Sequence, residues 1–179
     1  MRTLFLLPAF SISLLAACST LSRSSRVELP SQRTPFYVTV SAPAGWEGPG
    51  YGSWSSYDSW SFSRGQDPDA SYLAVRFDPV RPGQFQSGAA TPEEVVAYFK
   101  DTFTNPQAER IATATIDGSP VAVFAIHNVA GEQYATSIRR GDTQISISLD
   151  APDRATLDRH RRTFLAFLNS FRLASTNDA

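Results

Sequence analysis

Residues 143–150 read Thr-Gln-Ile-Ser-Ile-Ser-Leu-Asp, and their alternation decides the fold class. The apolar side chains of Ile145, Ile147 and Leu149 alternate with polar ones, which is typical of a β-strand with one buried face. Three more β segments precede this strand, at residues 109–117, 120–129 and 132–140. Because only short turns separate the four segments, we predict a meander of antiparallel strands with one buried face.

Two helices are expected around this meander. The first begins at Thr91-Pro92-Glu93-Glu94, where Thr91 can cap the free N–H groups and Glu94 can complete a capping box. The second begins at Pro152 and repeats apolar side chains at helical spacing. Earlier strands are expected at residues 36–41, 60–63 and 71–78, with a Gly-rich loop over 47–53. The chain therefore predicts an α+β fold, a single domain in which one antiparallel β-sheet is flanked by two helices.

The N-terminus has the pattern of a bacterial lipoprotein signal. Arg2 precedes an apolar stretch over residues 4–15, which is shorter than the roughly 20 residues that span a bilayer. It leads into Leu15-Ala16-Ala17-Cys18, which resembles a lipobox, and Cys18 is the only cysteine of the chain. We therefore expect a signal peptide over 1–17 and a lipidated Cys18 as the membrane anchor. Because Ser19 rather than an aspartate follows the cysteine, we expect an outer-membrane location facing the periplasm.

Composition sets the remaining boundaries and excludes some partners. Residues 18–34 are Ser-rich and predict a tether, residues 35–173 form the domain, and residues 174–179 are expected to be a disordered tail. The formal net charge is −1, with arginines scattered among acidic residues. We therefore expect no nucleic-acid partner, since no basic block is present.

The chain resembles the PsbP-like superfamily, which includes the DcrB-type bacterial lipoproteins. The resemblance rests on Ala42-Pro43-Ala44-Gly45-Trp46 after a short strand, the capped helix from Thr91, the turn Asp117-Gly118, and the last helix ending in residues 164–171. It covers roughly residues 35–172. The resemblance implies an antiparallel sheet flanked by helices and a binding or accessory role, and it supplies no site residues.

Catalytic and metal-binding patterns are weak in this sequence. His127 and His160 are the only histidines, and without local ligand spacing we interpret both as structural or surface residues. No Gly-x-Ser-x-Gly elbow is present, and Asp117-Gly118-Ser119-Pro120 has the composition of a turn. No Gly-rich phosphate loop precedes a helix. We therefore expect no enzyme activity, no cofactor and no metal.

The aromatic stretch between Trp46 and Phe62 is the strongest indication of a function. Tyr51, Trp54 and Tyr57 lie among serines and glycines, and we predict that they form an exposed binding surface. An envelope protein, a glycan or lipid headgroups would each suit such rings. The alternative is that Trp46, Trp60 and Phe62 belong to the core and the other rings lie at its rim.

The sequence thus favours a membrane-anchored, non-catalytic binding or accessory lipoprotein of the bacterial cell envelope. An envelope hydrolase with a cryptic site and a mainly structural lipoprotein are the alternatives. A cleft that brings a serine, a histidine and an acid together would favour the hydrolase.

The Cys18→Ser variant tests whether the protein is anchored by a lipid at this residue. The variant should take no lipid label and should leave the membrane fraction, because the acyl chains attach to this thiol. Metabolic lipid labelling and fractionation measure both effects. A variant that stays in the membrane, together with a wild type that takes no label, would contradict the lipoprotein assignment.

Overall fold

The computed structural model describes residues 25–65, 70–81, 84, 90–101, 103–129 and 131–175. Cys18 and the expected signal peptide lie outside these residues. Ten strands and two helices lie within them: β1 (Arg26–Pro30), β2 (Phe36–Ser41), β3 (Glu47–Ser53), β4 (Asp58–Arg64), β5 (Ser71–Pro79), α1 (Pro92–Phe99), β6 (Gln107–Ile116), β7 (Ser119–Asn128), β8 (Gly131–Arg140), β9 (Thr143–Ala151), α2 (Arg154–Ser170) and β10 (Arg172–Ser175).

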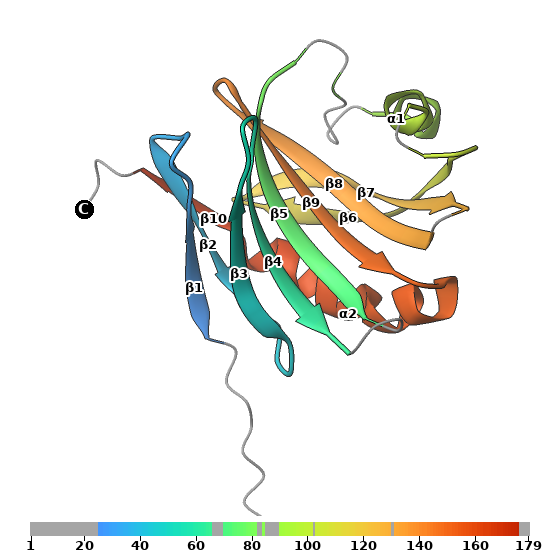
Figure 1. Ribbon diagram of the computed structural model, residues 1–179, viewed down its shortest axis with the longest axis horizontal. Helices are drawn as coiled ribbons and strands as arrows, with labels where there is room; N and C mark the ends of the chain where they lie inside the picture. Colours follow the sequence, from blue (N-terminus) through green and yellow to red (C-terminus); the bar gives the residue numbers. More distant parts are fainter. Residues whose placement is uncertain are drawn as a thin grey trace, which may run out of the picture.

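The strands form two antiparallel sheets, which Figure 1 shows from the side opposite α2. The larger sheet has the order β3-β4-β5-β9-β8-β7-β6, and the smaller has the order β1-β2-β10. The predicted meander is confirmed, since β6, β7, β8 and β9 pair with their neighbours in sequence order. Ile145, Ile147 and Leu149 are fully buried, as their alternation predicts.

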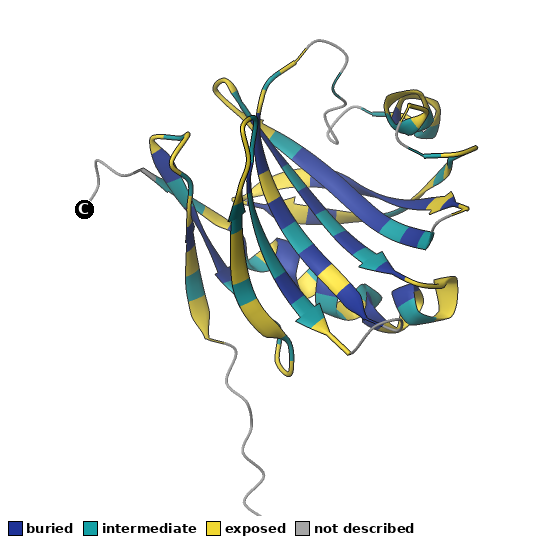
Figure 2. Cartoon of the chain, in the orientation of Figure 1, coloured by how far each residue is buried: buried dark blue, intermediate teal, exposed yellow. Residues whose placement is uncertain are grey.

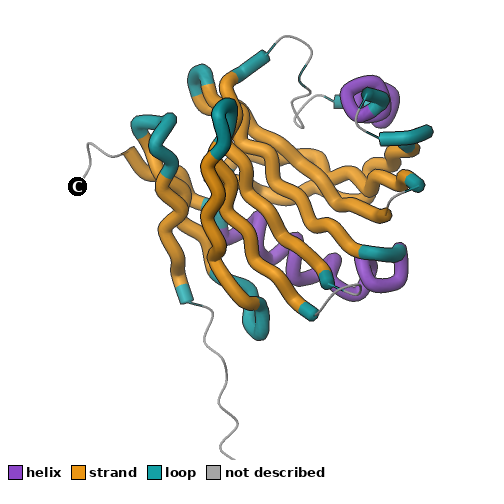
Figure 3. Tube along the Cα trace, in the orientation of Figure 1, coloured by secondary structure: helices purple, strands orange, loops and turns teal. Residues whose placement is uncertain are grey.

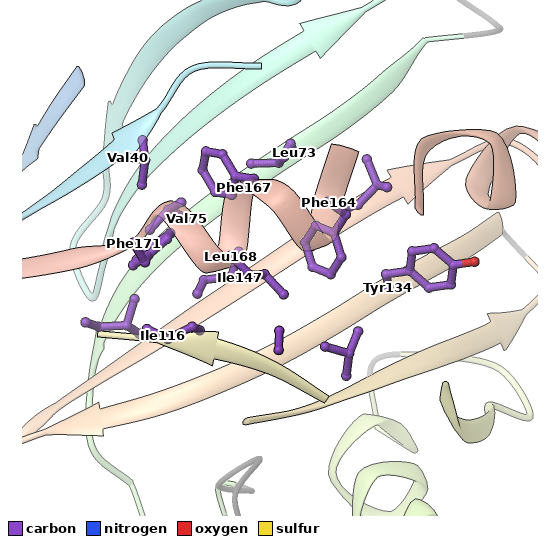
Figure 4. Packing of buried hydrophobic residues seen from close by; sticks show 14 of the residues in the cluster. Val40, Leu73, Val75, Ile116, Tyr134, Ile147, Phe164, Phe167, Leu168 and Phe171 are labelled. Carbon is purple, nitrogen blue, oxygen red and sulfur yellow. The ribbon is translucent and has the colours of Figure 1, made fainter. Parts of the chain in front are cut away.

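Helix α2 supplies the centre of the main core. Its buried side chains include Phe164, Phe167 and Leu168, and Phe171 follows at its C-terminus. In Figure 4 these side chains lie between Val40 of the smaller sheet and strands of the larger sheet. Asp153 caps the helix by accepting a hydrogen bond from the Thr156 N–H at 2.8 Å. One helix face therefore joins the two sheets through apolar contacts.

Helix α1 covers part of the opposite face of the larger sheet. It begins with the predicted capping box, in which Thr91 and Glu94 exchange hydrogen bonds with each other's backbone N–H. Its Val95 packs on Ala122, Phe124 and Ile126 of β7, which point away from α2. The two helices thus lie on opposite sides of the sheet (Figure 3). Exposure alternates along the strands, as Figure 2 shows, because neighbouring side chains face opposite sides.

The expectation of one sheet with two flanking helices needs correction. Residues 26–30 were expected in the tether, yet they form β1, because Leu29 is buried and pairs with Val38 of β2. On the other side of β2, Leu173 also pairs with Val38, so a strand runs into the segment expected to be the tail. Residues 47–53 form β3 rather than a loop. Backbone pairing with β2 for β1 and β10, and with β4 for β3, outweighs the Ser- and Gly-rich composition of these segments.

Asp58 ties the loop between β1 and β2 to the end of the larger sheet. Its buried carboxylate accepts hydrogen bonds from Ser31 Oγ at 2.7 Å, Gln32 N at 3.1 Å and Ser53 Oγ at 2.7 Å, and Arg33 Nε lies 3.4 Å away. Burial by itself would raise the pKa of Asp58, but these hydrogen bonds and the arginine charge outweigh burial and lower it.

Ile147→Ala should lower the free energy of unfolding by about 2–5 kcal/mol, because it leaves a cavity in the main core. Ser146→Ala, on the same strand but facing the other side, should change it by less than about 1 kcal/mol. Urea unfolding of both variants measures the difference. Equal effects would contradict the assignment of the two faces.

Asp58→Asn should destabilise the protein by about 1–3 kcal/mol at neutral pH, since an amide cannot accept all of the hydrogen bonds of this buried carboxylate. Because the pKa of Asp58 is lowered by folding, the stability that the carboxylate contributes is present above its unfolded pKa. This contribution is lost as the pH falls through the folded pKa, so the deficit of the variant should shrink in acid.

The control is Asp142→Asn, which removes an exposed carboxylate with only a 4.0 Å contact to Arg139. It should change stability little at any pH. Thermal melts across an acid series that show the same behaviour for both variants would contradict the role of Asp58.

Candidate functional site

The face of the larger sheet opposite α2 carries a trough of small side chains. The strand registers place Ser61, Ala74, Ser148 and Ala135 in one row across β4, β5, β9 and β8. The next row contains Ser59, Arg76 and Ser146. Small side chains leave room above the backbone, so this part of the sheet can receive a ligand that larger side chains would exclude.

Trp54 and Tyr57 form one wall of the trough. They lie in the turn between β3 and β4, where the Trp54 N–H donates a hydrogen bond to the Tyr57 carbonyl at 2.9 Å. Their rings stack with centroids 4.7 Å apart and an interplanar angle of 20°. Gly52 makes this possible, because a Cβ there would lie 2.3 Å from the Trp54 ring. Trp54 remains half exposed, at 50%.

Arg76 extends the stack onto the sheet. Its guanidinium carbon lies 3.7 Å from the centroid of the Tyr57 ring, at cation–π distance. The same guanidinium pairs with the buried Asp78, with Nη2 at 2.6 Å and Nε at 3.0 Å from Oδ1. Trp54, Tyr57 and Arg76, which we call the Trp54 stack, are therefore ordered by Asp78 at one end and Gly52 at the other.

Helix α1 forms the opposite wall of the trough, and we call the space between this helix and the Trp54 stack the groove. Tyr98 and Phe99 lie at its end, and both line a pocket of about 240 Å³ together with the Trp54 stack, Ser59, Ala74, Ser146 and Ser148. The side chains of Tyr98 and Phe99 make an edge contact with centroids 4.9 Å apart. The groove thus has aromatic walls and a floor of hydroxyl and methyl groups.

Hydrogen-bond acceptors lie beside the groove. Asp150 accepts hydrogen bonds from Gln133 Nε2 at 2.7 Å and from Ser148 Oγ at 3.0 Å, and burial raises the pKa of this carboxyl group. Gln133 lines both the groove and an adjoining pocket of about 360 Å³ that also contains Asp150 and Glu132. The side-chain oxygens Gln133 Oε1 and Glu132 Oε2 are enclosed and have no hydrogen-bond partner among the residues that the structure describes. Gln133 and Ser148 thus connect the lining of the groove to the carboxylate of Asp150.

The structure brings together only two of the three predicted surface rings. Tyr51 is 43% exposed, but β3 pairs it with Trp60 on the other side of the sheet, with ring centroids 4.7 Å apart. Trp60 in turn donates from Nε1 to the Pro30 carbonyl at 2.8 Å, so this pair joins β4 to β1. Strand alternation separates Tyr51 from the groove, because Gly52 and Tyr51 face opposite sides.

Sequence reasoning did not identify Arg76, Asp78, Tyr98, Gln133 and Asp150 as parts of this site. For Arg76, Asp78 and Asp150 the available signal was the alternation in β5 and β9, which predicts that polar side chains share the outer face. Which outer-face residues meet is decided by cross-strand register, and one chain does not show that register.

The histidines and Ser119 lie away from the groove. His127 contacts Glu132 through Nδ1, and Ser119 follows a turn in which Asp117 and Gly118 have φ of 48° and 80°. His160 makes an edge contact with Trp46. In the part of the chain that the structure describes, neither histidine bonds a serine hydroxyl, and no group of three or more metal-ligating side chains is present.

No helix among the described residues is long and apolar enough to cross a membrane. The comparison with protein-family models gives no match. No curated protein matches the sequence either.

A solved structure does resemble this chain. The solution structure of cyanobacterial PsbP (CyanoP) from Synechocystis sp. PCC 6803 matches with a TM-score of 0.50 and 17% identity, over 89% of this chain and 99% of that one. At that identity the likeness concerns the fold alone. The chain therefore has a PsbP-like fold, with two helices and antiparallel sheets.

Proposed function

We propose that this protein is a non-catalytic glycan-binding module of the bacterial cell envelope, anchored through Cys18 to the periplasmic side of the outer membrane. The observation that carries the proposal is the Trp54 stack beside a trough of small polar side chains. The ligand lies in the groove between this stack and α1.

Sugar chemistry matches the groove in two ways. The apolar C–H face of a pyranose ring packs on an aromatic ring, and the exposed Trp54 offers such a face. The floor of Ser59, Ser146 and Ser148 can exchange hydrogen bonds with hydroxyl groups. A wholly apolar ligand would leave these serine hydroxyls without such partners, so the floor favours a polyhydroxylated ligand.

We assign no reaction to the groove, because its carboxylates are already engaged. Asp78 pairs with Arg76, and Asp150 accepts hydrogen bonds from Gln133 and Ser148. Glycoside hydrolysis needs a carboxylic acid and, across the scissile bond, a carboxylate that can reach the sugar or a water molecule. The ion pair with Arg76 occupies Asp78 in this respect. The groove residues therefore fit binding better than bond cleavage.

Trp54→Ala/Tyr57→Ala tests this site, with a soluble oligosaccharide of β-1,4-linked N-acetylhexosamines as the probe. The double variant should bind the probe about tenfold or more weakly, because it removes the stacking surface at the centre of the site. Titration calorimetry measures the affinity. The melting temperature should fall only slightly, since a fully buried tryptophan would cost about 3–5 kcal/mol and this one is half exposed.

Tyr51→Ala is the matched control, because it removes an equally exposed ring from the other side of the sheet. It should leave the affinity unchanged. Equal losses in both variants, or a wild type that binds peptides and not the sugar, would contradict the glycan assignment. A large drop in melting temperature in the double variant would show that these rings are packing residues.

A further inference from the structure

A second pocket lies on the other side of the molecule, between the end of β4 and the first turns of α2. Its volume is about 450 Å³, and it is lined by Arg64, Gly65, Thr156, Arg159 and His160. Arg64 and Arg159 are exposed, and His160 is nearly buried. Three side chains that are cationic or can become cationic thus converge on one hollow, although they come from separate parts of the chain.

Among the residues that the structure describes, no acidic side chain forms an ion pair with Arg64 or Arg159. The ion pairs of arginine in this part of the chain involve Arg33, Arg76, Arg139 and Arg154. The charge of Arg159 contributes to the lowered pKa of Asp153, which lies six residues earlier. The carboxylate of Asp153 nevertheless caps the helix by accepting a hydrogen bond from the Thr156 N–H. The described lining of the pocket therefore carries a net positive charge.

His160 responds to that charge. Burial lowers the pKa of His160, and the positive charges of Arg64 and Arg159 lower it further. The charge of Arg64 acts on the imidazole from β4, and that of Arg159 acts on it from α2. The uncharged ring of Trp46 makes an edge contact with the same imidazole. An anion seated between the two arginines would offset their field and favour the imidazolium.

The pocket lies at the end of the molecule where the described chain begins. The Ser25 carbonyl accepts a hydrogen bond from Ala42 N at 2.8 Å. Three residues further on, a Cβ on Gly45 would lie 3.8 Å from an Arg64 guanidinium nitrogen. In Figure 1 the start of β1 and the end of β4 lie at the same lower edge of the molecule. Cys18 lies seven positions before Ser25, which limits the distance between their Cα atoms to about 25 Å.

We infer that Arg64, Arg159 and His160 bind the phosphate of an anionic lipid headgroup in the membrane that carries the anchor. Guanidinium groups hold phosphate oxygens through paired, charge-assisted hydrogen bonds, and two unpaired arginines around one hollow provide several donors. This contact orients the domain with the arginine pocket toward the lipid and leaves the groove beside the Trp54 stack on another face. The assignment uses the proposed lipid anchor for its orientation.

Vesicle binding by the Cys18→Ser protein tests the pocket without the anchor. The protein should bind vesicles of phosphatidylcholine with phosphatidylglycerol and should not bind phosphatidylcholine alone. Arg64→Gln/Arg159→Gln in this background should bind about 30-fold more weakly, because each arginine near an anionic surface contributes on the order of fivefold. Flotation with a vesicle titration measures the affinities.

The charge-matched control is Arg81→Gln/Arg140→Gln. These arginines lie at the far end of the sheet, since the Val80 N–H bonds the Asp142 carbonyl and Arg140 pairs with Thr143. The full length of β5 separates them from Arg64, roughly 25 Å at the usual rise per residue. The control should keep its affinity. An equal loss in the control, or no binding of the Cys18→Ser protein to anionic vesicles, overturns the proposal.

A histidine titration by NMR separates lipid headgroup from free phosphate. Soluble glycerophosphoglycerol should raise the pKa of His160 and leave that of His127 unchanged, and the chain contains only these two histidines. An unchanged pKa of His160 overturns the site. A shift with inorganic phosphate but none with glycerophosphoglycerol overturns the lipid assignment. If the protein binds anionic vesicles through these arginines but the wild type takes no lipid label, the headgroup site is confirmed and the lipid anchor at Cys18 is contradicted.

Discussion

Burial of one face of α2 is the contact on which the rest of the structure depends. The chain contains a single cysteine and so cannot form an internal disulfide, and the two sheets are held together by packing and hydrogen bonds. Phe167 contacts Phe62 of the larger sheet and Phe171 in edge geometry, with centroids 5.7 Å and 5.6 Å apart. Phe164 reaches Tyr134, whose hydroxyl donates to Asp158 on the same helix. These rings remove a large apolar area from water, which is the main favourable term in folding.

This one-sided core leaves the other face of the larger sheet available. Helix α1 is short and covers β6 and β7. Strand β7 carries apolar side chains on both of its faces, one set toward α1 and the other toward α2. Over β4, β5 and β9 the same face carries serines and alanines, with aromatic and charged side chains at the borders. An antiparallel sheet needs only one buried face for stability. The side chains on its second face are therefore free to form a ligand-binding surface. The groove beside the Trp54 stack occupies this second face.

The two proposed sites differ in chemistry as well as in place. The groove combines half-exposed rings with neutral hydroxyl groups and acceptor oxygens, and its arginine is neutralised by Asp78. The second pocket has few polar acceptors and two unpaired arginines. One site thus suits a neutral, polyhydroxylated ligand and the other an anion. Together, the two proposals place the arginine pocket at the membrane and leave the groove open to a glycan on another face.

The sequence by itself determined the local elements, because each depends on neighbours within a few residues. The alternation of Ile145, Ile147 and Leu149 predicted β9 and its buried face, and the capping box at Thr91 predicted the start of α1. The same local patterns could not show the second sheet, since β1 and β10 form only when Leu29 and Leu173 meet Val38 from opposite sides. Tertiary structure also separated Tyr51 from Trp54 and brought Arg64 to Arg159, because strand register and helix packing, rather than distance along the chain, decide which side chains meet.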